Sequence, residues 1–409
     1  MPRITDVTCV LVSERLPAEW AAAHGVSSKR DEALVFITTE DGRVGVGESY
    51  HAFSPGTIPG IVEGHIREIL VGRDSSEIQL LWEEVFFSTG QLGSAAVAAM
   101  SGVDIALWDL LGRRTGLPVA TLLGGGGVDL VPAYVGCMCL GFQDAASLRE
   151  EVKLYLSQGY TAMKLRGGKD LEADVEAVAT AREVAGPHVD LMIDANSAYS
   201  PPESLQLAKR LERYGTFWLE DPFDFSVKYH HADMGWLRKA SPVPICSGGN
   251  VYTRFDVRAL IDAGGVDYLT PDVCKCGGLS EAMRIAALAS AHNIIVAPHT
   301  VVGIGTVAGV HYTAAIPTHV RGHMEWDASV VNPLRDEMCR PALSIVDGCI
   351  AVPTGPGLGV EVPSAAMLER FSFIPGREIS MPPRRRRWDP ALRNPARQVR
   401  REPVTTAVK

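Results

Sequence analysis

Two carboxylates stand near the ends of two short apolar runs of the chain. Asp194 lies in LMIDAN and Glu220 lies in FWLEDP. The same pattern predicts a third carboxylate in PICSGGN, but Gly249 stands there. Carboxylate oxygens suit a divalent cation such as Mg2+, and glycine offers no side-chain oxygen. We therefore expect a candidate site for a divalent cation that lacks one of its carboxylate ligands.

Further polar residues follow other apolar runs, at the point where each run ends. They are Lys164, Arg166, Asn196, Asp221, Asn250, Asp272, His299 and Glu325. Taken alone, each has a simpler role, such as capping a helix or reaching solvent. If the runs are parallel strands of a barrel, however, their carboxyl ends converge on one face. Charged side chains seldom gather there unless they pair or bind a ligand, so this set is the candidate active site.

The elements that position these residues lie between residues 126 and 340. Helix-patterned stretches, such as 174–184 and 279–292, alternate there with strand-like runs that end roughly every 23 to 29 residues. The runs are VPAYVGCM, AMKLR, DLMIDAN, FWLEDP, PICSGG, DYLTPDV, NIIVAPH and RGHMEW. This alternation of strand-like runs and helix-patterned stretches predicts a closed α/β barrel. An open doubly wound sheet is disfavoured because no Gly-rich dinucleotide-binding pattern follows the first run.

Residues 1–125 show a different pattern. Strand-like runs at 7–12, 33–39 and 44–48, with a turn at Glu40-Asp41-Gly42, predict an antiparallel meander. A long alanine-rich stretch at 95–111 is apolar nearly all round and predicts a buried helix. The glycine run that follows Leu123 marks the end of this α+β domain.

The carboxyl-terminal part divides into two segments. Residues 341–376 contain another short strand, a turn at PTGPGLG and the run VEV, which predict a return to the N-terminal domain. Residues 377–409 are rich in arginine and proline and have almost no apolar periodicity. This extension is either a flexible or subunit-contacting segment or a basic patch for an anionic partner.

Composition excludes several classes of function. The chain has 409 residues, 46% of them apolar and 21% charged, and a formal net charge of −9. A negative body is expected to repel nucleic acid, and no apolar run approaches the ~20 residues of a membrane span. The N-terminus has no signal-peptide pattern, so we expect a cytoplasmic protein. Its eight cysteines lack CxxC spacing and are expected to be buried thiols without chemistry.

The motifs GYTAMKLR, IDAN, WLEDP, GGNVYTR, PDVCKCGG, APH and MEW occur in this order. Through them the chain resembles the enolase superfamily, and within it the mandelate racemase subgroup, over nearly its whole length up to the tail. The resemblance implies a modified TIM barrel, (β/α)7β, with an α+β capping domain. It also implies one Mg2+ ion held by three carboxylates and removal of the proton α to a substrate carboxylate.

The resemblance also implies roles for individual residues. As metal ligands it indicates Asp194 and Glu220, with Asn250 a candidate replacement for the third. A His299–Asp272 dyad would move the proton, and Lys164 would add positive charge at the substrate carboxylate. Glu325 would bind the other carboxylate oxygen, which requires that it be protonated or share a proton. Substrate contacts are expected from Arg166, Asn196, Tyr50 and His24; the alternative role for Arg166 is an ion pair with a neighbouring strand-end carboxylate.

Two departures from the family pattern stand out. The family commonly has Lys-x-Lys where this chain has Lys164-Leu165-Arg166, and Gly-Glu-Asn where it has Gly248-Gly249-Asn250. Arginine keeps its proton at ordinary pH and is a poor base, which disfavours racemisation by two bases. The glycine removes one anionic ligand and is expected to weaken the Mg2+ site.

These residues lead to one principal prediction and two alternatives. The principal prediction is a lyase that uses a single base to dehydrate a sugar acid to a 2-keto-3-deoxy acid. One alternative is an isomerase on the same scaffold, either a racemase or epimerase or a lactone cycloisomerase. The other is a metal-poor, non-catalytic binding or assembly protein. A small carboxylate is the expected ligand, and the resemblance is the only basis for expecting a homo-oligomer, a dimer or an octamer.

Overall fold

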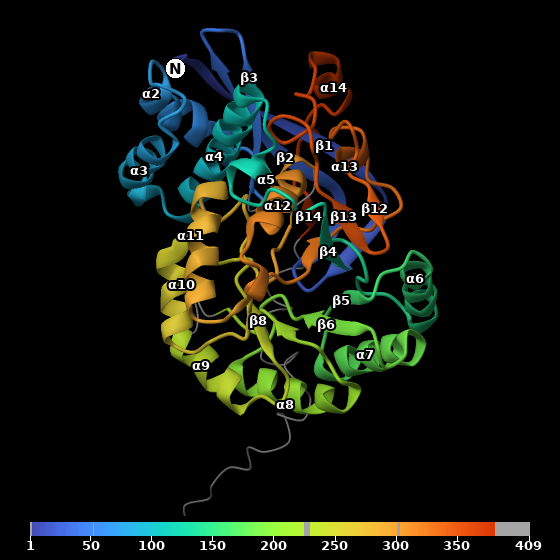
Figure 1. Cartoon of the computed structure of the whole chain (residues 1–409). Coiled ribbons are helices and arrows are strands. Elements are labelled where there is room, and N and C mark those ends of the chain that lie inside the picture. The colour runs from blue at the N-terminus through green and yellow to red at the C-terminus, as the bar shows by residue number, and fades with distance from the viewer. Residues whose placement is uncertain (1, 52, 225–229, 301–302, 381–409) are drawn as a thin grey trace, which may run out of the picture.

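The computed structural model describes residues 2–51, 53–224, 230–300 and 303–380. Its elements form a barrel and a cap of strands and helices that packs on one end of it (Figure 1). The C-terminal elements, drawn in orange and red, lie beside the blue N-terminal strands, as expected for a chain whose end returns to its beginning.

The cap contains an antiparallel sheet and a set of helices. Strand β1 (Ile4–Ala22) pairs with β2 (Gly25–Thr39), which also pairs with β3 (Val44–Ser49) and β14 (Ile379–Ser380). The predicted meander is confirmed, although β1 and β2 are far longer than the apolar runs indicated. The helices are α1 (Thr57–Ile61), a π-helix (Val62–Ile66), α2 (Arg67–Leu70), α3 (Ile78–Ser88), a 3-10 turn (Gly90–Leu92), α4 (Ser94–Thr115) and α5 (Val119–Leu122).

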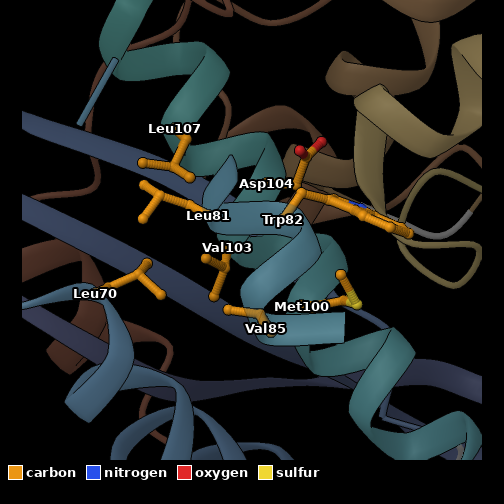
Figure 2. A pocket seen from close by; sticks show the side chains of 8 residues that line it. All are labelled: Leu70, Leu81, Trp82, Val85, Met100, Val103, Asp104 and Leu107. Atoms are coloured by element: carbon orange, nitrogen blue, oxygen red, sulfur yellow. The ribbon is translucent and has the colours of Figure 1, made fainter. Parts of the chain in front are cut away.

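Helix α4 is the core of the cap. It packs closely on β3, because an added Cβ on Gly47 would lie 2.1 Å from the carbonyl oxygen of Gly102. By length and composition α4 could cross a membrane, but 78% of its most apolar window is buried inside the protein. Between α3 and α4 lies an apolar pocket of about 10 Å3, room for at most one water molecule (Figure 2). This pocket belongs to the core of the cap.

Eight parallel strands form the barrel. They are β4 (Leu130–Val135), β5 (Ala162–Arg166), β6 (Asp190–Asp194), β7 (Leu219–Glu220), β8 (Ile245–Ser247), β9 (Tyr268–Leu269), β10 (Ile295–Val296) and β11 (Met324–Trp326). Each pairs with the next, from β4 to β10, and β11 pairs with β4. A parallel bridge between Val296 and Arg321 closes the barrel between β10 and β11.

Seven helices connect these strands within the described residues, which confirms the (β/α)7β architecture. They are α6 (Ala145–Ser157), α7 (Leu171–Ala185), α8 (Pro201–Leu211), α9 (His231–Ala240), α10 (Thr253–Asp262), α11 (Gly278–Ala291) and α12 (Ile304–Ala315), with 3-10 turns at Glu212–Tyr214 and Thr318–Val320. Inside the barrel, Tyr134, Trp218 and Cys246 are buried and pack together beneath the mouth. This layer supports the charged residues at the strand ends.

The C-terminal part differs from its prediction in one respect. After α13 (Pro333–Asp336), the hairpin of β12 (Ile345–Val346) and β13 (Cys349–Ala351) pairs antiparallel with β4. This part of segment 341–376 therefore extends the barrel sheet and does not return to the cap. The return begins beyond it, where the backbone N–H of Leu358 donates to Asp109 of α4, and continues through α14 (Ala365–Arg370) to β14.

The predicted extension begins inside the cap sheet. Ile379 and Ser380 of segment 377–409 form β14, so the first residues of this segment are structured. Residues 381–409, including the arginine run 384–387, lie outside the described residues. The proposed boundaries at residues 125, 340 and 376 stay a prediction.

Candidate active site

Strand register brings the first site residues side by side. In the β5–β6 pair, Arg166 lies opposite Asp194, and in the β6–β7 pair, Asp194 lies opposite Glu220. Each strand ends at or next to these positions, so the three side chains enter the mouth of the barrel together. The predicted convergence of strand ends is therefore present here.

Lys164 is the centre of a buried charge network. Its side chain is fully buried, and Nζ lies 2.7 Å from Glu220 Oε1 and 3.1 Å from Glu325 Oε1. Asp194 Oδ2 is 3.9 Å away. Burial lowers the pKa of Lys164, but the carboxylates of Glu220 and Glu325 outweigh it and raise the pKa above its ordinary value. Lys164 is therefore a fixed positive charge and a poor candidate for a base.

Arg166 forms the second cationic link. Its Nη1 pairs with Asp194 Oδ2, and its Nη2 lies 3.1 Å from Glu325 Oε1. The backbone carbonyl of Cys137 accepts from Nε at 2.9 Å and also from Nη2. The ring of Trp20, from the end of β1, lies 5.9 Å from the guanidinium carbon. The guanidinium thus joins carboxylates of β6 and β11 under a residue of the cap.

Glu325 is held mainly through Oε1, while Oε2 accepts from the backbone N–H of Thr300 at 3.5 Å. Its Oε1 accepts from the backbone N–H of Cys137 at 2.6 Å in addition to contacting Lys164 and Arg166. Burial raises the pKa of Glu325, but Lys164, His299 and Arg166 together lower it by more. The net result is a pKa below its ordinary value. This arrangement therefore favours the ionised carboxylate over the protonated or proton-sharing Glu325 that the resemblance implies, because Lys164 and Arg166 lie against it.

Glu220 has the opposite electrostatic character. Burial, together with the nearby carboxylates of Asp194 and Glu325, raises its pKa to about 8 against the lowering effect of Lys164. Asp194, Glu220 and Glu325 are three potential negative charges, and Lys164 and Arg166 are two positive ones. A proton on Glu220 near neutral pH makes this five-residue network formally neutral.

His299 and Asp272 form the predicted dyad on the other side of the mouth. Nδ1 of His299 lies 2.7 Å from Asp272 Oδ2, and Asp272 Oδ1 accepts from the backbone N–H of Cys274 at 2.7 Å. Because an ionised carboxylate only accepts hydrogen bonds, the Nδ1 proton points at Asp272, and Nε2 is the ring nitrogen left to exchange a proton with a ligand. Nε2 lies 3.7 Å from Glu325 Oε2, and the His299 side chain is 20% exposed. This is the geometry of an accessible general base.

The candidate metal ligands are occupied by protein donors. Asp194 Oδ1 accepts from the backbone N–H of Asn196 at 2.8 Å, and Oδ2 accepts from Arg166. Glu220 Oε1 accepts from Lys164 at 2.7 Å, and Oε2 accepts from Nε1 of Trp218 at 2.9 Å. All four oxygens therefore have a donor, and for each carboxylate one donor is a cation.

Neither remaining candidate supplies a third ligand. Gly249 has no side chain, and Asn250 donates from Nδ2 to Asp221 Oδ2 at 3.1 Å while its Oδ1 accepts from Lys275 at 3.3 Å. Asn250 thus turns away from Asp194 and Glu220, contrary to the expectation. Among the residues that the structure describes, no three His, Cys, Asp or Glu side chains are arranged to hold a metal ion. The donors present do not fit the Mg2+ site that the family pattern implies.

Other expected substrate contacts occupy defined places. Asn196 adopts a positive φ of 45° and donates to Asp194 from its backbone N–H and, at 3.1 Å, from Nδ2, so it orients that carboxylate. Tyr50 lies in the cap with its ring 4.2 Å from Nζ of Lys275. The ring of His24, between β1 and β2, stacks on Phe53. Their contact with a substrate stays a prediction.

Two participants, Lys275 and Cys137, were not anticipated from the sequence. Lys275 lies three residues after Asp272, 3.9 Å from its carboxylate, and links it to Asn250 and Tyr50. Its position in the loop after β9 was a usable signal. Cys137 acts through its backbone N–H and carbonyl, so its residue type carried no signal. The eight cysteines are free thiols, as expected.

The chain matches two protein families along its length. Residues 4–124 match the mandelate racemase / muconate lactonizing enzyme N-terminal domain, and residues 147–366 match the enolase C-terminal domain-like family. A D-galactarolactone cycloisomerase of Agrobacterium fabrum is 32% identical over 378 residues, 90% of this chain and 98% of the relative. An arabinonate dehydratase of Saccharolobus solfataricus is 31% identical and covers 80% of this chain and 87% of its own length.

Solved structures agree with these matches. A member of the enolase superfamily from Polaromonas sp. JS666 has a TM-score of 0.87 and 35% identity, and covers 93% of this chain and 100% of its own. A racemase from Streptomyces coelicolor with bound magnesium has a TM-score of 0.81 and 29% identity, and covers 90% of this chain and 98% of its own. On its sequence motifs, its (β/α)7β barrel with a cap and these matches, the chain belongs to the enolase superfamily, in the mandelate racemase subgroup.

Proposed function

We propose that this chain is a one-base eliminating enzyme that removes the proton α to the carboxyl group of a sugar acid. The observation that carries this proposal is the His299–Asp272 dyad, which faces the cations Lys164 and Arg166 across the mouth of the barrel. One side of the site is equipped to move a proton. The other side holds two buried cations, Lys164 and Arg166, as the N–H donors proposed to face a developing oxyanion.

The residues support chemistry with one base. Racemisation needs a second base on the opposite face of the substrate, where Lys164 and Arg166 stand. Lys164 is held by carboxylates that raise its pKa, and arginine stays protonated at any ordinary pH. An enzyme that takes and returns a proton on the same face is therefore favoured over a racemase or epimerase.

The proposed reaction balances its atoms without an added reactant. Nε2 of His299 takes the proton from the α carbon, and the electron pair moves to the carboxyl oxygens beside Lys164 and Arg166. The enolate then expels the hydroxyl of the β carbon, and the proton on Nε2 leaves with it as water. The resulting enol tautomerises to a 2-keto-3-deoxy acid. Asp272 holds the Nδ1 proton and stabilises the imidazolium between the two steps.

A lactone cycloisomerase is the second candidate. The same one-base elimination becomes an isomerisation when the group leaving the β carbon is a ring oxygen, because this oxygen remains part of the molecule. The cycloisomerase and dehydratase relatives have nearly equal identity to this chain, at 32% and 31%. The leaving group, and not the base, would distinguish the two reactions.

A substrate screen tests the proposal. Purified protein is incubated with aldonic acids, aldaric acids and their lactones, with MgCl2 or with EDTA, and keto acids are detected with semicarbazide. We expect one group of compounds to give a keto acid, and His299→Asn to abolish the signal. Loss of water, measured by mass spectrometry, assigns the dehydratase, and an unchanged mass assigns the cycloisomerase. Deuterium incorporation at the α carbon without a keto product would assign an epimerase.

One outcome would contradict catalysis altogether. If no acid is turned over but one binds with saturable heat, the chain is a binding protein, which was the non-catalytic alternative. The assembly and location of the protein are further parts of the proposal: a homo-oligomer, a dimer or an octamer, in the cytoplasm. Sedimentation velocity and cell fractionation test these two points.

A further inference from the structure

We propose that the barrel mouth of this chain works without a divalent metal ion, because Arg166 and Lys164 take the place of its charge on Asp194, Glu220 and Glu325. This inference deepens the proposed function and rests on it for the chemistry. Its statement about metal binding is tested separately from turnover. It explains both departures from the family pattern, Arg166 and Gly249, by one cause.

The two buried cations bridge the three carboxylates of the mouth. Arg166 spans from Asp194 to Glu325, and Lys164 spans from Glu220 to Glu325. Asp194 and Glu220, the two carboxylates that a metal would need, are each paired with a cation that is fully or nearly fully buried, with side-chain exposures of 6% for Arg166 and 0% for Lys164. A divalent ion would have to compete with both cations for these carboxylates, and displacing them would leave Glu325 as the one carboxylate partner of two buried cations.

Arginine makes a particular contribution to this network. The planar guanidinium presents five N–H donors in a fixed fork, whereas a lysine is a single point charge. Nη1 pairs with Asp194 while Nη2 pairs with Glu325, and Cys137 O holds the guanidinium through Nε and Nη2. Four of the five N–H groups are used by described residues. The fifth, on Nη1, remains for an oxygen of a ligand.

The formal charge of the five-residue network disfavours a divalent ion. Three carboxylates and two cations leave one negative charge uncompensated when all five residues are ionised. A glutamate at position 249 would leave two, which is the charge that one divalent ion neutralises. With glycine at 249 a divalent ion would overshoot neutrality by one charge. The absence of the third carboxylate therefore reduces the electrostatic demand for a divalent ion by half.

The space beside Gly249 is bounded by the ring of His299. An added Cβ at this position would lie 3.1 Å from Cδ2 of His299, so the glycine allows the His299 ring to approach the backbone of the β8 loop. The φ of Gly249 lies outside the range that only glycine favours, in contrast to Gly248 at +139°. A side chain is therefore compatible with the backbone at 249 if the imidazole shifts by a few tenths of an ångström. This makes the family residue testable here.

The experiment compares four proteins: wild type, Arg166→Lys, Gly249→Glu and the double variant that carries both changes. Each is titrated with MgCl2 by calorimetry and with MnCl2 by electron paramagnetic resonance, which reads the bound ion without any substrate. We expect no saturable binding of either ion to wild type. The double variant should bind saturably, at least about tenfold more tightly than the weakest affinity that the wild-type titration could have detected. Asp194→Asn in the double variant should remove this binding, and thermal melts check that each protein is folded.

A second arm uses the reaction. Turnover of the acid identified in the screen should be equal in EDTA and in MgCl2 for wild type, whereas the double variant should lose turnover in EDTA. Saturable Mn2+ binding to wild type that Asp194→Asn abolishes would overturn the inference. If no acid is turned over, the proposed function fails, but the titrations without substrate still decide the metal question on their own.

Discussion

The two sides of the barrel mouth are built in different ways. On the side of β5, β6, β7 and β11, five charged residues are buried and interlocked, and Lys164 and Glu325 have no exposed side-chain surface. On the side of β9 and β10, a single pair, His299 and Asp272, is joined by one hydrogen bond, and the imidazole is 20% exposed. A fixed charge works best when it cannot move, whereas a proton carrier must reach its substrate.

The largest expected effect lies on the dyad side. His299→Asn removes the lone pair that takes the α proton but keeps a polar side chain, so kcat should fall by about 10²- to 10⁴-fold with little change in stability. Steady-state kinetics and exchange of the α proton in D2O measure it. His319→Asn, at an exposed histidine, is the matched control. Full exchange in His299→Asn would place the base elsewhere.

The next effect lies on the network side and concerns folding. Lys164→Met removes a fully buried cation and leaves Glu220 and Glu325 facing each other, which should lower the free energy of unfolding by about 3 to 5 kcal/mol. Urea denaturation measures this change. Lys153→Met is the control, because its partner Glu150 is exposed and such pairs contribute little. Equal stabilities of the two variants would show that the network is not structural.

The network side should also depend on pH in a defined direction. The folded protein holds the Glu220 proton up to a pKa of about 8, against an ordinary value of 4.5. The folded state therefore binds more protons than the unfolded state between these values, and the contribution of Glu220 to stability falls as pH rises through this window. Thermal melts from pH 5 to 8 should show a smaller decline in Glu220→Gln than in wild type.

Glu325 should behave in the opposite way. Its pKa is lowered by its cationic neighbours, so its contribution to stability is present above its ordinary pKa and is lost as pH falls below it. Glu325→Gln should therefore be less sensitive to acid than wild type. An identical acid response in the two proteins would contradict the ionised state of Glu325.

The smallest expected effect concerns Asn250, in the loop after β8, between the charge network and the His299–Asp272 dyad. Asn250 bonds to Asp221 and Lys275 and not to Asp194 or Glu220, so Asn250→Ala should change kcat/KM by less than about tenfold. Saturable Mg2+ binding to wild type that Asn250→Ala weakens by about tenfold to 100-fold would instead identify Asn250 as a ligand. Calorimetry with MgCl2, run beside wild type, separates these outcomes.

Much of this architecture could be predicted because its signals are local. The strand-like runs of the barrel carry period and β-branched composition in their own residues, and a closed parallel barrel then brings Asp194, Glu220 and His299 to one face. The length of β1 and β2 could not be predicted, because buried charges such as Lys29 and Glu32 interrupt the apolar pattern where the cap packs on the barrel. The β12–β13 hairpin was misplaced because pairing with β4 depends on a partner more than 200 residues away.

The amino-acid sequence determined which groups are available: a superfamily barrel with a cap, one histidine base with its carboxylate, and a position 249 without a ligand. Only the tertiary structure decided how those groups are used. Whether Glu325 is ionised, whether Asp194 and Glu220 are free, and where Asn250 points depend on distances of a few ångströms between different strands. Coulomb interactions in a buried site change steeply over such distances, and spacing along a chain does not specify them.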